Sequence, residues 1–127
     1  MKAKFKNGLY VYTMTTEETV QILHILTHSS YASYSIWHDF GSACMSLNLV
    51  NTDNDSICDS ETNIKAKQTK NGHCKFFMSY NDVTEILKAL NLGVPEFECY
   101  TLWVIFSGLA HNMGIVTKHN GDLRTYY

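Results

Sequence analysis

PEFECYTLWVIFSGLAHNM, residues 95–113, is the most apolar run of the chain, and it organises the predicted fold. Pro95 suits the first position of a helix because it lacks the N–H that would be unpaired there, and Gly114 offers a stop. Around a helix, the apolar side chains of this run point in nearly every direction, which is typical of a helix surrounded by protein. The exception is a narrow polar strip of Tyr100, Ser107 and His111. The sequence therefore predicts a central buried helix.

Two other structures are compatible with parts of this run. Residues 99–106 are rich in aromatic and β-branched side chains, which also suit a pair of buried strands. A membrane span needs about 20 apolar residues, whereas this run has two glutamates near one end and His111-Asn112 near the other. We therefore prefer the buried helix and expect no contact with a membrane.

Length and composition describe one globular domain. The chain has 127 residues, of which 45% are hydrophobic, and a single proline. A chain of this length buries about two thirds of its unfolded surface around one core. The basic start MKAKFKNG is followed by no apolar stretch and therefore does not resemble a secretory signal. We expect one domain over residues 1–127, located in the cytoplasm.

Three Asn-Gly pairs indicate hairpins, because Asn-Gly favours the two-residue turn between antiparallel strands. The predicted hairpins join residues 2–6 with 9–14, 63–70 with 73–80, and 115–119 with 122–127. Two further strands, 34–40 and 43–50, are predicted around Gly41-Ser42, the second from its alternating apolar and polar residues. Hairpins with segregated helices give an α+β fold, in which a hairpin-rich antiparallel sheet packs on the central buried helix with two further amphipathic helices.

The first of these two helices has a clear start. Thr15 caps it and Glu18 completes a T-x-x-E capping box, after which the helix runs to about His28. Its apolar residues, Val20 among them, are expected to face inward. The opposite face is shared by Glu17, Gln21, His24 and His28.

The second helix is predicted over residues 82–92, with Asn81 as its cap and Gly93 as its end. The segments VYTMTTEETVQILHIL and KFFMSYNDVTEILKAL both run from a strand through a polar cap into a helix. Strand-cap-helix units look alike for physical reasons, so we prefer chance likeness and keep internal duplication as the alternative.

Candidate metal ligands and nucleophiles are few. His24 and His28 stand four apart on one helix, a spacing that brings two imidazoles to one metal, but the glutamate of an H-E-x-x-H motif is missing. The four cysteines form no C-x-x-C pair, so separate buried thiols are preferred over a zinc site of Cys58, Cys74 and His73. We expect no metal and no cofactor.

Two clusters of like charge lie between these elements. The acidic one resembles a calcium loop but lacks the glycine and glutamate of an EF-hand, so a solvated loop is preferred over an irregular cation site. The basic one lies on the middle hairpin, where lysines commonly block edge-to-edge pairing, and that interpretation is preferred over anion binding. The acidic cluster is Asp53, Asp55, Asp59 and Glu61, and the basic one is Lys65, Lys67, Lys70 and Lys75.

The net charge of -2 is distributed unevenly. Residues 1–6 carry three lysines, residues 7–64 carry seven acids and neither Lys nor Arg, and Arg124 is the only arginine. A 58-residue span without a basic side chain argues against nucleic-acid binding by that part of the chain. Arginine, the usual bidentate partner of phosphate, is also scarce. We therefore expect a protein partner and no direct contact with nucleic acid.

These observations favour a non-enzymatic binding protein over an enzyme. No convergent catalytic set is present, whereas acidic residues suit the basic groove of a nucleic-acid-handling protein, which they would block. The predicted contact residues are Glu17, Glu18, Asp53, Asp55, Asp59 and Glu61. By analogy of general character, a small, Asn-rich chain with lysine in place of arginine suits an accessory protein of a phage or mobile element, such as an anti-CRISPR inhibitor in the host cytoplasm.

Two alternatives belong to other classes of protein. The first is a small enzyme or ligand-binding domain with a pocket at Tyr100, Ser107 and His111, although mid-helix Ser107 has no free backbone N–H groups beside it to hold an oxyanion. A deep cavity lined by convergent polar groups would favour this alternative. The second is a homodimer with a structural role, which light scattering distinguishes from a monomer.

Overall fold

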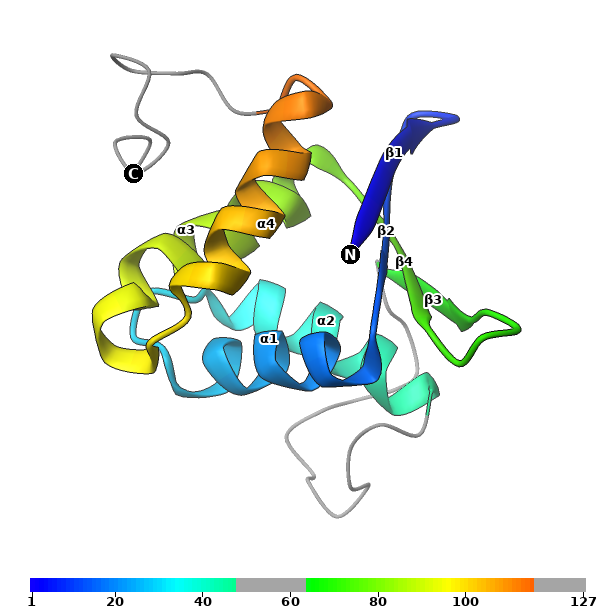
Figure 1. Ribbon diagram of the computed structural model, residues 1–127. Helices are drawn as coiled ribbons and strands as arrows, with labels where there is room; N and C mark the ends of the chain where they lie inside the picture. The colour runs from blue at the N-terminus through cyan, green and yellow to red at the C-terminus, as the bar shows by residue number, and fades with distance from the viewer. Residues whose placement is uncertain (48–63, 116–127) are drawn as a thin grey trace.

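A four-stranded antiparallel sheet and four helices make up the computed structural model, which describes residues 1–47 and 64–115. This architecture confirms the predicted α+β class. The strands are β1 (Lys2–Lys6), β2 (Leu9–Met14), β3 (Lys65–Gln68) and β4 (Cys74–Met78), in the order β1-β2-β4-β3. The helices are α1 (Thr16–His28), α2 (Tyr34–Ser46), α3 (Tyr80–Phe97) and α4 (Tyr100–Asn112). The helices lie on one side of the sheet (Figure 1).

The first two predicted hairpins are confirmed. β1 pairs with β2 and β3 pairs with β4, both antiparallel. Gly8 and Gly72, the second residues of the two Asn-Gly pairs, have φ of +81° and +80°, a backbone conformation that glycine adopts without steric cost. The third predicted hairpin lies outside the described residues, apart from Ile115.

The described elements repeat the order strand, strand, helix, helix. The two Asn-Gly turns lie 64 positions apart in the sequence, at 7 and 71, and Tyr12 and Phe76 have the same separation. These two residues also sit directly opposite each other in the β2–β4 pair. An approximate two-fold axis therefore passes through the centre of the sheet. Such a relation between whole β-β-α-α units favours internal duplication over chance likeness.

Alternation along the two central strands gives the sheet an inner and an outer face. On the inner face, Tyr12 and Met14 of β2 and Phe76 and Met78 of β4 are buried in the core. The Tyr12 ring stacks on Phe106 of α4 with centroids 4.2 Å apart, and its hydroxyl donates to the Phe106 carbonyl at 3.0 Å. Burial raises the pKa of the Tyr12 hydroxyl, which keeps it protonated as a donor. These contacts fix α4 on the sheet.

The first helix, α1, begins and ends where the sequence predicts. The Thr15 hydroxyl accepts from the Glu18 N–H at 3.1 Å, and the Glu18 carboxylate accepts from the Thr15 N–H at 2.9 Å. Glu18 also lies 3.8 Å from the N-terminal amine of Met1. The prediction that Val20 faces inward is wrong, because Thr19 takes the buried position and Val20 is 45% exposed.

The capping box predicts a stability difference between two neighbouring glutamates. Glu18→Ala is expected to lower the free energy of unfolding by about 0.5 to 1 kcal/mol, because the Thr15 N–H loses its acceptor and the terminal amine loses its counter-charge. Glu17→Ala is the control, since Glu17 is exposed on the same turn and is expected to change stability by less than about 0.5 kcal/mol. Urea unfolding measures both variants, and equal losses would contradict the capping role.

Residues 34–46 form the single helix α2, so the prediction of two strands over 34–40 and 43–50 is wrong in this region. The Ser33 hydroxyl caps the helix by accepting from the Ile36 N–H at 3.2 Å. Buried apolar side chains then recur every three or four residues, which is the helical period. The apparent alternation is incidental, because the Phe40 ring stacks on the sheet at 4.8 Å between centroids. The buried apolar residues of α2 are Ile36, Phe40, Ala43 and Cys44.

The predicted central helix over residues 95–113 is wrong at its start. Pro95 lies inside α3, in its last turn, and Phe97 is the final residue of that helix. Glu98 then adopts the left-handed conformation, with φ of 51° and ψ of 40°, and the chain turns before α4 begins. The apolar run is therefore divided between two helices.

Helix α3 exceeds its predicted limits at both ends. Its cap is Ser79 rather than Asn81, and Ser79 forms a capping box with Asp82. It also continues through Gly93, where an added Cβ would lie 3.0 Å from the Phe97 ring. Gly93 is therefore a packing residue inside the helix and does not end it.

Helix α4 is not surrounded on all sides as predicted. Leu102, Trp103 and Phe106 face the core, whereas Val104 and Ile105 are 37% and 38% exposed. α4 thus has an inward and an outward side. The described chain has three helices besides α4, one more than the two that were predicted beside the central helix. In the ranges that the structure describes, no helix is long and apolar enough to cross a membrane.

Candidate functional site

The structure describes two of the six acidic residues predicted to contact a partner. Glu17 is exposed on the first turn of α1, which suits a contact residue, whereas Glu18 is partly exposed and belongs to the capping box. The others lie outside the described residues: Asp53, Asp55, Asp59 and Glu61. The acidic-surface hypothesis therefore stays a prediction.

The three residues of the polar strip of α4 differ in their burial and contacts. Ser107 is buried, and its hydroxyl donates to the Val104 carbonyl of its own helix at 3.3 Å. Tyr100 is 54% exposed and faces Trp103, with ring centroids 6.0 Å apart, and His111 is partly buried. The hollows described below are lined by other residues. This geometry gives no support to a pocket at Tyr100, Ser107 and His111.

His24 and His28 lie side by side, with ring centroids 4.6 Å apart. Within residues 1–47 and 64–115, no group of three or more His, Cys, Asp or Glu side chains is arranged to hold a metal. A hollow of about 470 Å³ runs along the same helix, but all of its lining belongs to the outward face of α1, so it is open surface. The lining residues are Thr16, Glu17, Val20, Gln21 and His24.

The described cysteines are buried thiols. Cys44, Cys74 and Cys99 are free and lie in the core. Burial raises the pKa of the Cys44 thiol, and the neighbouring Cys74 raises it further; burial also raises the pKa of Cys99. A protonated thiol is a poor nucleophile and a poor metal ligand. Cys58, the remaining member of the alternative zinc site, lies outside the described residues.

The outer face of the sheet brings six lysines together from three strands. Side chains that are partners in register lie on the same face of a sheet. One row across the four strands is Lys2, Thr13, Lys75 and Lys67, the next row is Lys4, Val11, Phe77 and Lys65, and Lys6 pairs with Leu9. We call these ten residues the lysine face.

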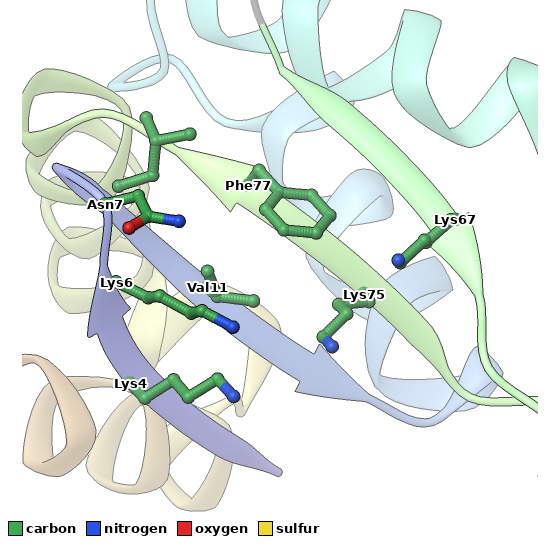
Figure 2. A pocket seen from close by; sticks show the side chains of 8 residues that line it. Lys4, Lys6, Asn7, Val11, Lys67, Lys75 and Phe77 are labelled. Atoms are coloured by element: carbon green, nitrogen blue, oxygen red, sulfur yellow. The ribbon is translucent and has the colours of Figure 1, made fainter.

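The lysines of this face border an apolar centre. Val11 is only 3% exposed although it does not belong to the core cluster, because lysine stems and the Phe77 ring surround it. The Lys67 ammonium lies 5.7 Å from the centroid of the Phe77 ring, a cation–π arrangement. Figure 2 shows Val11 and Phe77 on adjacent strands, with Lys67 and Lys75 beside the ring and Lys4 across the sheet.

Two shallow hollows cross the lysine face. Their volumes are about 200 and 270 Å³, and both are lined by Lys4, Val11 and Lys75. No carboxylate lines either hollow, and the lysines of the face form no ion pair with any residue of the described part of the chain. Small-molecule sites usually have volumes of about 300 to 1,000 Å³. Both hollows of the lysine face are smaller than this range.

Charge is segregated between the sheet and the helices. In the described ranges, Lys88 is the only Lys or Arg of the helices, and every acidic residue lies in a helix or at a helix cap. Lys67 and Lys75 face each other directly across β3 and β4, and such like-charge pairs destabilise a sheet by about 0.2 to 1 kcal/mol. A bound anion would relieve this repulsion between the two ammonium groups. The acids are Glu17, Glu18, Asp39, Asp82, Glu85, Glu96 and Glu98.

The two halves of the fold show that Lys75 and Phe77 are not required by the sheet. Their counterparts 64 positions earlier are Val11 and Thr13, on the same face of β2. On the inner face, in contrast, Tyr12 and Phe76 are large buried residues in both halves, and Met14 and Met78 are the same residue. Lysine and an aromatic ring on β4 are therefore specific to one half and point to a role outside folding.

In the sequence, these lysines belong to two separate features, the basic start of the chain and the middle hairpin. The interpretation as edge protection suits Lys65 and Lys67, because β3 is an edge strand, but Lys75 lies on the interior strand β4. The sequence signal that could have grouped these lysines is that they recur at every second residue along each strand. Only the strand order shows that the separate alternations share one face.

Comparisons with protein-family models, with curated proteins and with solved structures found no match for this chain.

Proposed function

We propose that the protein is a non-enzymatic binding module that holds a polyanionic macromolecule on its lysine face. The observation that carries this proposal is the union of six lysines on one open face that has no carboxylate. Clustered charge of one sign creates a potential that attracts a partner of the opposite sign. Release of counterions from a polyanion then favours binding at low salt.

The proposal keeps the class inferred from the sequence, a protein that acts by binding, and moves the contact to another surface. An inhibitor that engages a basic partner through Glu17, Glu18 and the acids between 53 and 61 remains a separate prediction. The lysine face requires an anionic partner, whereas the acidic residues require a cationic one. A single measurement with a defined polyanion therefore separates them.

The test is a titration of labelled inorganic polyphosphate with the full chain, followed by fluorescence anisotropy at about 50 mM and about 200 mM salt. Binding is expected at the lower salt concentration. If three lysines contact phosphate, the affinity should fall by about 10-fold or more at the higher salt concentration. Absence of binding at about 50 mM salt, or an affinity that does not respond to salt, would overturn the proposal.

A further inference from the structure

We infer that the polyanion is single-stranded nucleic acid, held with a base on the Phe77 ring and its phosphates beside the surrounding lysines. This inference rests on the proposed function and adds the chemistry of the ligand. It is carried by one juxtaposition: an aromatic ring lies in the middle of a face that is otherwise built for anions.

Phe77 has the position that a stacking platform needs. Its ring projects from an interior strand to the outer face, is only partly buried, and lines the hollow of about 200 Å³ together with Lys67 and Lys75. Aromatic rings on open sheets stack nucleic-acid bases without regard to sequence, because every base has a π face. The Thr13 counterpart shows that the fold accepts a small polar residue at this position.

The width of the face suits one strand of nucleic acid. Neighbouring strands lie about 4.8 Å apart, so the backbones of β1 and β3 are separated by roughly 14 Å across three spacings. Lysines border this width on both sides, and the two interior strands carry Leu9, Val11 and Phe77 toward one end and Thr13 and Lys75 toward the other. A single strand presents bases on one side and phosphates on the other, which matches an apolar centre with charged borders.

Other polyanions would use only part of this surface. A duplex keeps its bases stacked inside and presents phosphates alone, so the Phe77 ring would have no partner. Carboxylates of an acidic protein would pair with the lysines and likewise leave the ring unused. Lysine supplies point charges without the bidentate geometry of arginine, so we expect binding with little preference for base sequence.

The sequence-based expectation of no direct contact with nucleic acid rested on residues 7–64, which carry no basic side chain, and on the scarcity of arginine. The six lysines of the lysine face come from either side of that span, at positions 2 to 6 and 65 to 75. The β2–β4 pairing brings the two sides together. Binding of an acidic protein in place of nucleic acid is one of the outcomes that the experiment below can show.

The experiment compares two labelled probes of equal length and charge, an oligothymidylate of about 12 nucleotides and an abasic oligodeoxyribose phosphate of the same length. At about 50 mM salt, wild-type protein is expected to bind the thymidylate about 10-fold more tightly, which corresponds to about 1.4 kcal/mol. A difference of this size agrees with one base stacked on an aromatic ring. The abasic probe measures the electrostatic part alone.

Two variants assign the difference to the ring. Phe77→Thr copies the residue of the other half and is expected to bind both probes with the affinity of the abasic one. Phe77→Trp should retain the preference, and its added indole fluorescence should be quenched by the thymidylate and not by the abasic probe. Wild-type protein is the optical control, because Trp37 and Trp103 belong to the helices behind the sheet. Urea unfolding verifies that each variant is folded.

The outcomes separate this inference from the proposed function. Equal binding of both probes, unchanged in Phe77→Thr, would overturn base stacking and leave polyanion binding standing. No binding of either probe would overturn both. Tighter binding of a duplex of the same length, or of a polyglutamate peptide, than of the thymidylate would also overturn the single-strand inference and assign the face to that class of partner.

Discussion

Reversing three lysines together, Lys4→Glu, Lys6→Glu and Lys75→Glu, is expected to weaken polyanion binding by about 100-fold or more. A lysine beside an anionic surface contributes about 1 kcal/mol, so the loss of three amounts to more than two factors of ten. All three residues line the hollows of the lysine face. The slope of log affinity against log salt concentration should become shallower by about three, which is one for each lost phosphate contact.

A matched pair of single variants distinguishes binding through the lysine face from binding that depends only on the net charge of the protein. Lys75→Glu and Lys88→Glu change the net charge equally, but Lys75 lies on the outer face of β4 and Lys88 is exposed on α3. We expect Lys75→Glu to cost about 10-fold in affinity and Lys88→Glu to cost less than about 2-fold. Similar losses in both variants would mean that binding follows net charge, and the lysine face would lose its role.

The reversal is not expected to unfold the protein. Lys75→Glu places a carboxylate opposite Lys67, which replaces a repulsive cross-strand pair with an attractive one. Lys75 is partly exposed on the open face of the sheet, and substitutions outside the core usually change stability by less than about 0.5 kcal/mol. Urea unfolding of the triple variant therefore serves as its control, and a large loss of stability would leave the single variants as the measure of binding.

Phe106→Ala is expected to lower the free energy of unfolding by about 3 to 5 kcal/mol. Phe106 is fully buried, and its ring stacks on Tyr12 with centroids 4.2 Å apart, so truncation leaves a cavity between α4 and the sheet. Domains of this size have a total stability of about 5 to 15 kcal/mol. Urea unfolding followed by circular dichroism should show a midpoint at a clearly lower urea concentration than that of the wild-type protein.

The neighbouring residue provides the control for this prediction. Ile105 is 38% exposed on the outward side of α4, so Ile105→Ala is expected to cost less than about 1 kcal/mol. The two positions are adjacent and both apolar, but Phe106 is buried whereas Ile105 lies on the exposed side of the helix. If Ile105→Ala were as costly as Phe106→Ala, α4 would be surrounded by protein on both sides, as the apolar pattern of the run suggests.

The elements predicted well are those whose signals are local. An Asn-Gly pair forces its own turn, and the Thr15–Glu18 capping box satisfies the helix end within four residues. The errors arise where two periods fit the same residues. The segment that forms α2 alternates and also repeats every three or four residues, and contact of Phe40 with the sheet selects the helix. Likewise, Glu98 carries no sequence signal for the left-handed conformation that separates α3 from α4.

By itself, the sequence determined the α+β class, both described hairpins and the start of α1, because turns and caps are satisfied by neighbouring residues. Only the tertiary structure decided which residues share a surface. The lysines at 2–6 and 65–75 are separated by the acidic span of the chain, and the pairing of β2 with β4 places them on one face around Phe77. Strand order depends on burial of the inner-face residues against the helices, a property of the whole core that no local pattern carries.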